Sequence, residues 1–457
     1  MKRLTTLAIL LATTTLASAA GNDTTNESFI LQAGAKNTAN VGQFKDKGAN
    51  KGGDNNQGTV QLGARNNSLT AQQSDKGGVN NSATVEVGFG NQSTVGQLDG
   101  KNDQATVQLG KFNTATTLQT SEGSKKSDNA SFIGQLGTAN ASSVGQSVGI
   151  NGQDNNSATL QFGLANSVVA TQNSGNAKND KGPGGENNSF ALQFGEFNTA
   201  TINQDSAVRG NDTKARGGVQ NDSATLQFGD GNAATTNQSG AVDGKKADKA
   251  SNDSLTFQHG EFNSSKANQV NGNNGQATLQ VGFGNGAKTK QKNAADSDAA
   301  NASLTLQIGQ GNSSKANQTN GNNAQATVQV GFDNDATTKQ KNVDGGTGVN
   351  GSLTLERGAF NTATTSQKIA NPTSSGLNGS LIAQLGVRNT ATVQQSDATG
   401  MQPMIGANLQ ATVQVGFGNT ATTMQTASAN LTNTSVTAQF GSQNTAITTQ
   451  SSKPAPK

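Results

Sequence analysis

The side chains that could do chemistry in this sequence are amides rather than acids, bases or thiols. The 457 residues include one histidine, no cysteine, no tryptophan and no tyrosine. His259 has no recurring acidic partner, and other copies of its segment carry Phe, Val or Leu in its place, which argues against a catalytic base. No Cys or His cluster offers a zinc site. The sequence therefore predicts a protein that is not an enzyme and holds no metal or cofactor.

The amides recur in a fixed frame around a glycine. Gln stands two residues before the glycine, Asn three after it and Gln nine after it, and an Asn stands eight before it. The frame occurs sixteen times, and Glu86 and Glu356 replace the leading Gln in two copies. Glycine takes positive φ freely, so we expect a turn at Gly34, Gly63, Gly88, Gly110, Gly137, Gly163, Gly195, Gly229, Gly260, Gly282, Gly309, Gly331, Gly358, Gly386, Gly416 and Gly441.

Amides at one repeat position can stack in register, each donating to one neighbour and accepting from the other, which satisfies buried polar atoms. The sequence predicts such structural ladders from Gln32, Asn37, Gln43, Gln61, Asn66, Gln72, Gln108, Asn113, Gln119, Gln161, Asn166, Gln172, Gln193, Asn198, Gln204, Gln227, Asn232, Gln238, Gln280, Asn285, Gln291, Gln307, Asn312, Gln318, Gln329, Asn334, Gln340, Gln384, Asn389, Gln395, Gln414, Asn419, Gln425, Gln439, Asn444 and Gln450.

The elements that must position these amides are strands. In residues 304–318, apolar Leu304, Leu306 and Ile308 alternate with polar residues up to the glycine, and a second polar strand follows the turn. One repeat is thus strand–turn–strand. A single repeat cannot bury a face alone, so neighbours must stack. The fold class that this predicts is all-β: a β-solenoid of stacked strand–turn–strand repeats with two facing sheets and cross-β geometry.

Charge orients the second strand, whereas the first strand stays open. Lys266, Lys288 and Lys315 share one parity of the second strand and must face water, so the other parity, with Asn312 and Gln318, faces inward. In the first strand, the ladder argument puts the amides inside and leaves an exposed apolar stripe. The opposite choice buries the apolar residues and exposes the amides. Such a stripe exceeds what a soluble monomer normally shows, and it would suit contact with another filament or with a folded-back half of the chain.

The chain divides into a leader, the repeats and a short tail. Residues 1–20 have a cationic start, a short apolar run and a small-residue cleavage pattern, which indicates a signal peptide and export. Residues 21–25 form a short N-terminal segment, 26–450 hold sixteen repeats with Gly/Lys/Asp-rich connectors, and 451–457 form a tail. The net charge of +3 falls to +1 without Lys2 and Arg3, so we expect no nucleic-acid partner and no membrane insertion.

The core Q-x-G-x-x-N-x-A-x-x-x-Q, as in QLGKFNTATTLQ (108–119), QFGEFNTATINQ (193–204) and QVGFGNTATTMQ (414–425), resembles the curlin repeat. The resemblance implies a subunit of extracellular curli fibres, functional amyloids of the biofilm matrix of Gram-negative bacteria. It implies self-assembly into a homopolymer, a nucleator subunit and an outer-membrane export pore as partners. The chain departs from the family at Asn301, where the family carries Ser, and in having only residues 21–25 before the first repeat.

A second hypothesis is a monomeric β-solenoid binding protein, either an adhesin or an ice-binding protein. Thr362 and Thr364 would point outward two residues apart, and stacked repeats would make a regular threonine array. Lysines interrupt any such face in consecutive repeats, which favours the fibre subunit.

Overall fold

Each repeat folds into two strands, and the computed structural model describes residues 26–45, 53–74, 78–121, 128–149, 154–175, 185–206, 219–240, 251–293, 299–343, 348–370, 376–397, 406–427 and 431–452. These residues form strands and no helix, so the predicted all-β solenoid of strand–turn–strand repeats is confirmed. The proposed signal peptide at 1–20, the segment 21–25, most of the connector residues and the end of the tail lie outside the described residues.

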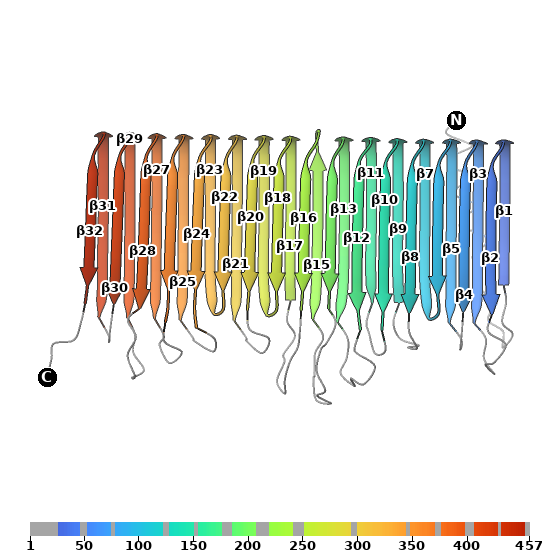
Figure 1. Ribbon diagram of the computed structural model, residues 1–457, viewed down its shortest axis with the longest axis horizontal. Coiled ribbons are helices and arrows are strands. Elements are labelled where there is room, and N and C mark those ends of the chain that lie inside the picture. The colour runs from blue at the N-terminus through green and yellow to red at the C-terminus, as the bar shows by residue number, and fades with distance from the viewer. Residues whose placement is uncertain are drawn as a thin grey trace, which may run out of the picture. The chain divides into compact units, whose positions relative to one another are not determined.

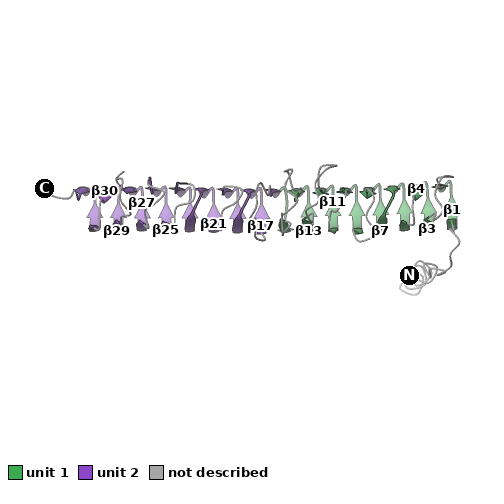
Figure 2. Cartoon of the chain, turned by 90° about the horizontal axis from the view of Figure 1, so that it is seen from below, with its two compact units in different colours: residues 1–231, 241–249 green, residues 232–240, 250–457 purple. Residues whose placement is uncertain are grey.

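The chain forms two compact units, coloured separately in Figure 2: unit 1 comprises residues 1–231 and 241–249, and unit 2 comprises 232–240 and 250–457. In unit 1 one parallel sheet consists of β1 (Asn26–Ala35), β3 (Asp54–Ala64), β5 (Val79–Phe89), β7 (Lys101–Lys111), β9 (Asp128–Thr138), β11 (Asn155–Leu164), β13 (Glu186–Glu196) and β15 (Gln220–Phe228). The facing sheet consists of β2 (Thr38–Lys45), β4 (Asn67–Ser74), β6 (Gln92–Leu98), β8 (Thr114–Ser121), β10 (Ala141–Val148), β12 (Ser167–Ser174) and β14 (Thr199–Asp205).

Unit 2 repeats this arrangement. Its odd-numbered sheet consists of β17 (Ser251–Glu261), β19 (Asn273–Phe283), β21 (Ala300–Gln310), β23 (Asn322–Phe332), β25 (Val349–Ala359), β27 (Leu377–Val387), β29 (Ala407–Phe417) and β31 (Thr432–Ser442). Its even-numbered sheet consists of β16 (Ala233–Ser239), β18 (Ser264–Val270), β20 (Gly286–Lys292), β22 (Ser313–Thr319), β24 (Asp335–Lys341), β26 (Thr362–Lys368), β28 (Thr390–Asp397), β30 (Thr420–Ala427) and β32 (Thr445–Ser451). Within each unit, successive strands of a sheet lie side by side (Figure 1).

The strand register aligns equivalent repeat positions. Gln280 of β19 lies beside Gln307 of β21, which lies beside Gln329 of β23. The same holds in the even-numbered sheet, where Gln291, Gln318 and Gln340 are consecutive partners. We call one repeat in this stack a rung. Because every rung keeps this register, a side chain meets its own equivalent above and below.

The interior between the sheets is mostly polar. Buried side chains are chiefly Asn, Gln, Ser and Thr, and the apolar clusters are small, such as the one around Ile382 with Ala363, Ala391 and Val393. The burial settles the orientation that the sequence left open. In β21, Ser303, Thr305 and Gln307 are buried, whereas Leu304 is 48% exposed and the apolar stripe faces out. The amides of both strands therefore face inward.

The bend lies later in the repeat than the sequence suggested. In fifteen of the sixteen rungs the glycine expected at the turn belongs to the end of the first strand, and only Gly229 follows its strand. Gly309 has φ +119°, and a Cβ there would lie 2.0 Å from the carbonyl oxygen of Gly331 in the next rung. The bend itself is at the two residues that follow the strand, Gly311 and Asn312 in this rung. The glycine is needed for close stacking of neighbouring backbones, in addition to its positive φ.

Candidate functional site: amide ladders and the open end rungs

The leading glutamines form a buried ladder that also joins the two sheets. Gln280 Nε2 donates to Gln307 Oε1 at 2.8 Å, and Gln307 Nε2 donates to Gln329 Oε1 at 2.8 Å. Gln307 Nε2 also donates to the backbone oxygen of Gly286 in β20, at 2.9 Å. Each amide thus bonds along the stack and across the interior. In such a network the amides supply hydrogen-bond partners to one another and to the backbone of the facing sheet.

The trailing glutamines make a second ladder of the same polarity. Gln318 accepts from Gln291 at 2.9 Å and donates to Gln340 at 2.9 Å, and its Nε2 also reaches the backbone oxygen of Ala302 in β21, at 2.7 Å. In both ladders the Nε2 atoms donate toward the C-terminal end of the stack.

The asparagines after the glycines form a third ladder at the bend. Asn312 Nδ2 donates to Asn285 Oδ1 at 3.0 Å and to the Gly331 carbonyl oxygen at 3.1 Å, and the Asn312 backbone N–H also donates to Asn285 Oδ1. The ladder holds the bend by supplying partners to backbone groups that the turn leaves outside the sheet. The sequence pattern of Gly followed three residues later by Asn reflects this geometry.

A fourth ladder was missing from the sequence-predicted site. Asn301 Nδ2 donates to Asn274 Oδ1 at 3.0 Å, and Asn323 Nδ2 donates to Asn301 Oδ1 at 2.7 Å. These residues stand eight before the glycine, where every repeat carries Asn. That complete recurrence was the signal that could have identified them.

The structure places the predicted glutamines on the inward parity of their strands, and it places the predicted asparagines at the bend between the two strands of each repeat. Those of the inner rungs are buried. Partial or full exposure is confined to the two ends of the chain's rungs, at Gln32, Asn37, Gln43, Asn444 and Gln450. Within each unit, the amides at one repeat position are therefore brought together, one rung apart.

Two carboxyl groups interrupt the leading-glutamine ladder. Gln61 Nε2 donates to Glu86 Oε2 at 2.7 Å, and Gln329 Nε2 donates to Glu356 Oε2 at 2.7 Å. Glu86 Oε1 and its next-rung neighbour Gln108 Oε1 are both buried without a hydrogen-bond partner among the described residues. Burial raises the pKa of the Glu86 carboxyl to about 8, against the lowering effect of the Gln61 hydrogen bond. A proton on Glu86 would supply the missing donor and restore the ladder.

Glu356 repeats this situation in unit 2. Its Oε1 and the neighbouring Gln384 Oε1 are likewise buried without a partner among the described residues. Burial raises the pKa of Glu356 to about 8, the Gln329 hydrogen bond lowers it and nearby Asp335 raises it further. Near neutral pH both glutamates are therefore mainly neutral members of the ladder.

The first and last rungs are open. Almost every residue of β1 is exposed, and β32 alternates between exposed and half-buried. Side chains that point outward on the last rung are exposed over most of their surface, with Val436 at 74% and Ile447 at 72%. An edge strand with unpaired backbone groups is a template for another strand.

The two ends are complementary in hydrogen bonding. The glutamine ladders place oxygen atoms at the first rung and Nε2 donors at the last, because donation runs from Gln32 to Gln61 at one end and from Gln425 to Gln450 at the other. At the bend, Asn444 Nδ2 donates to Asn419 Oδ1 of the preceding rung, which leaves Asn444 Oδ1 as an acceptor on the open side. In the stack, the equivalent Asn37 Oδ1 accepts from the backbone N–H of Asn66 in the next rung, so the backbone N–H of Asn37 in a second copy would fit Asn444 Oδ1. The last rung of one copy thus matches the first rung of another.

Other chemistry finds no support in the described residues. They contain no group of three or more His, Asp or Glu side chains placed to hold a metal ion. His259 lies on the outward face of β17, exposed. No helix long and apolar enough to cross a membrane occurs within the described ranges. Comparison with known protein families and with curated proteins gave no match to the chain.

Proposed function

We propose that this protein is a secreted structural subunit that assembles end to end into extracellular, curli-like amyloid fibres that give a biofilm matrix cohesion and adhesion. The observation that carries the proposal is the complementarity of the two open end rungs. Adding a copy would extend all four ladders and both sheets at the spacing already present within the chain. A heterologous contact of this kind does not close on itself and generates a filament.

The inward amides support the same proposal. Cross-β assemblies gain stability from in-register Asn and Gln columns, and each new rung satisfies the polar groups of the one before it. We infer that export precedes assembly, that the partner is the chain itself, and that a nucleator and an export pore serve the process.

Blocking the C-terminal edge tests the proposal. Gln443 N–H donates to Phe417 O of β29, and Ser452 N–H donates to Thr426 O of β30, so by alternation the N–H groups of Val436 and Ile447 point away from the preceding strands. Proline at these two positions removes edge donors without breaking an internal pair. We expect the Val436→Pro/Ile447→Pro protein to fold with wild-type circular dichroism but to fail to elongate wild-type seeds in a dye-monitored growth assay.

The matched control is Val436→Thr/Ile447→Thr, which keeps both N–H groups and should elongate seeds. Growth of the proline variant at the wild-type rate would refute assembly through this edge. Wild-type protein that stays monodisperse for days at micromolar concentration would instead favour the monomeric binding protein.

A further inference from the structure

The outer face of the odd-numbered sheet in unit 2 carries an apolar groove. The groove, of about 860 Å³, runs across consecutive strands from β17 to β31. From β19 to β27 its floor is a column of small residues that we call the small column: Gly275, Ala302, Ala324, Gly351 and Gly379. Asp253, Leu409 and Thr434 hold the same position in β17, β29 and β31. Beside the small column stands an outward column that includes Leu255, Leu304 and Leu353, all exposed. A continuous exposed apolar groove on a sheet face is a candidate interaction surface.

A second outward column, nearest the repeat glycine, is filled with larger side chains. We call it the large column; it includes Val281, Ile308, Val330 and Leu385. Small and large columns lie at opposite edges of the same face, six residues apart along each strand. The face is therefore asymmetric across the strand direction, and that asymmetry selects how another flat face could fit on it.

We propose that this face of unit 2 pairs with the same face of a second copy, about a two-fold axis that runs along the stacking direction. This axis reverses the strands and keeps the stacking direction, so each small column receives the partner copy's large column. An axis along the strands would instead put small column against small column and leave a void, and interfaces of this type are close-packed.

Charge placement agrees with the rung-by-rung match. Asp253 occupies the small-column position of β17, and His259 occupies the large-column position of the same strand. The two-fold axis brings the carboxylate of one copy opposite the imidazole of the other, twice per pair. Arg357 of β25 falls opposite Gly351, where a Cβ would meet no atom within 4 Å, so the large side chain of one copy meets the smallest residue of the other.

The area suffices for a stable contact. Eight strands at about 4.8 Å, with six residue steps of about 3.3 Å, give about 750 Å² on each copy. The total of about 1,500 Å² is that of a standard protein–protein interface. Pairing through a face does not depend on assembly through the ends, so it holds whether or not fibres grow.

The first test is the association state of freshly prepared full-length protein by sedimentation velocity, before any fibre appears. We expect wild-type dimers, and a shift of at least tenfold toward monomer for Leu304→Lys/Leu353→Lys. Both positions point outward, so the fold should be kept, as circular dichroism would verify. The matched control, Thr364→Lys/Thr392→Lys on the outer face of the even-numbered sheet, should remain dimeric.

Orientation is tested with a nitroxide on Lys266→Cys, a unique label because the chain has no cysteine. Parallel stacks would place the two labels roughly 30–40 Å apart, whereas reversed stacks would separate them by more than roughly 45 Å. The longer distance would overturn the axis proposed here.

A wild-type monomer would overturn the pairing, and uptake of an apolar dye by that monomer would assign the groove to a small ligand. Single-width fibres from monomers would refute the pairing alone, and dimers that never elongate would refute the fibre function alone.

Discussion

Units 1 and 2 have interiors of the same kind and outer surfaces of different kinds. Both contain the four amide ladders, and each contains one buried glutamate, Glu86 or Glu356. On the odd-numbered sheet, the position that is Gly or Ala from β19 to β27 in unit 2 is Asn or Asp in most strands of unit 1, and several of these side chains are hydrogen-bonded to one another. Asn156 donates to Asn188 at 2.9 Å, and Asn188 donates to Asp222 at 2.9 Å. Unit 1 therefore has a polar column where unit 2 has its groove.

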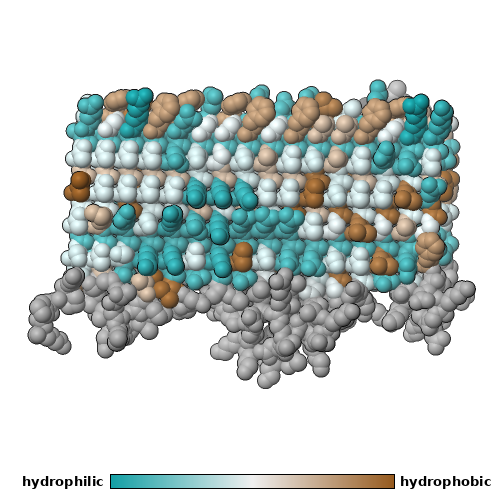
Figure 3. All heavy atoms as spheres, viewed as in Figure 1, coloured by the Kyte–Doolittle hydropathy of each residue, from teal (hydrophilic) through white to brown (hydrophobic). Residues whose placement is uncertain are grey.

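The outer faces of the even-numbered sheets differ as well. In unit 2, the outer face of this sheet carries one column with Lys266, Lys288 and Lys315, and further lysines lie beside that column. Figure 3 shows this face, where hydrophilic side chains predominate. Stacked like charges repel, so their placement on the face opposite the groove keeps them solvated if the grooves pair. The stack therefore fixes the inward residues, whereas the outward residues are free to give each unit its own surface.

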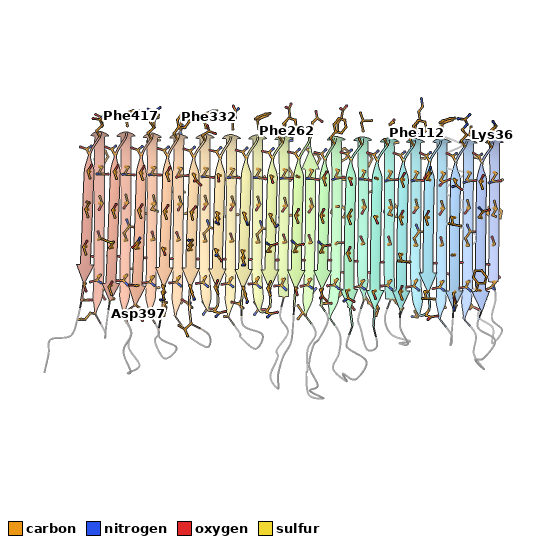
Figure 4. The ribbon with its side chains drawn as sticks, in the orientation of Figure 1. Lys36, Phe112, Phe262, Phe332, Asp397 and Phe417 are labelled. Atoms are coloured by element: carbon orange, nitrogen blue, oxygen red, sulfur yellow. The ribbon has the colours of Figure 1, made fainter. Side chains whose placement is uncertain are left out.

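The bend edge varies without a unit-specific pattern. Phe112 in unit 1 and Phe262, Phe332 and Phe417 in unit 2 project from this edge, and Asp397 lies at the other (Figure 4). Phe262 packs edge-on against Phe283 with ring centroids 5.6 Å apart. At the bend edge, both units therefore share a left-handed backbone conformation and not a type of side chain.

The shared interior makes the strongest prediction, which is that one substitution will have an equally large effect in both units. Gly163→Ala in unit 1 and Gly309→Ala in unit 2 each put a Cβ 2.0 Å from a carbonyl oxygen of the next rung, at φ near +120°. We expect each to cost more than about 3 kcal/mol locally, because backbone strain adds to the overlap. Hydrogen exchange of the flanking rungs would measure it.

The controls are Gly145→Ala and Gly275→Ala, in strands of the same units where a Cβ meets no atom within 4 Å. These should be neutral or slightly stabilising. If the controls and the test variants opened their rungs equally, close stacking of the backbones would not be the reason for the repeat glycine.

The buried glutamates provide the second prediction, which is a loss of stability in both units as the pH rises from 4.5 to about 8. A carboxyl whose pKa is raised from 4.5 to about 8 stays protonated in the fold while the unfolded chain ionises. Its contribution is complete below pH 4.5, declines as the pH rises, and is lost above about 8. The difference is about 3 to 5 kcal/mol for each group.

Glu86→Gln and Glu356→Gln should remove this dependence, because the amide supplies a donor at every pH. We expect the two variants to match the wild type near pH 4 and to exceed it at pH 9, in denaturant unfolding monitored by circular dichroism. An unchanged pH profile would show that the carboxyls reach water. A change in only one variant would show that the two interiors differ.

The sequence predicted a contact where both partners occupy the same position in successive repeats, because recurrence then reveals the pair. The ladder at Gln307 and the inward side of the second strand followed from recurrence and from the lysines. The inward side of the first strand did not, because an alternating strand offers two regular faces. What decides it is the bond from Gln307 to the Gly286 carbonyl in the other sheet, which no single strand reveals.

The groove and the buried acids escaped the sequence for a related reason. Small residues such as Ala302 and Ala324 read as variation within a repeat, and only the register places them in one column. Glu86 reads as a conservative replacement for Gln, yet its burial raises the pKa of its carboxyl, and the neighbouring Gln108 Oε1 has no hydrogen-bond partner among the described residues.

The smallest expected effect concerns the residue before the bend asparagine. Its backbone is left-handed in both units, and glycine, which adopts this conformation without strain, holds the position in only some rungs. Ala165 in unit 1 has φ 53°, whereas Gly284 holds the equivalent position in unit 2 with φ 63°, and a Cβ on Gly284 would meet no atom within 4 Å. A left-handed conformation costs an L-residue about 1 kcal/mol, partly offset by the greater freedom of glycine in the unfolded chain. Ala165→Gly should therefore stabilise its rung by less than about 1 kcal/mol, and Gly284→Ala should destabilise its rung by a similar amount. Hydrogen exchange at Asn166 and Asn285 would measure both, and a shift of the same sign in the two variants would mean that side-chain contacts at the bend outweigh its backbone strain.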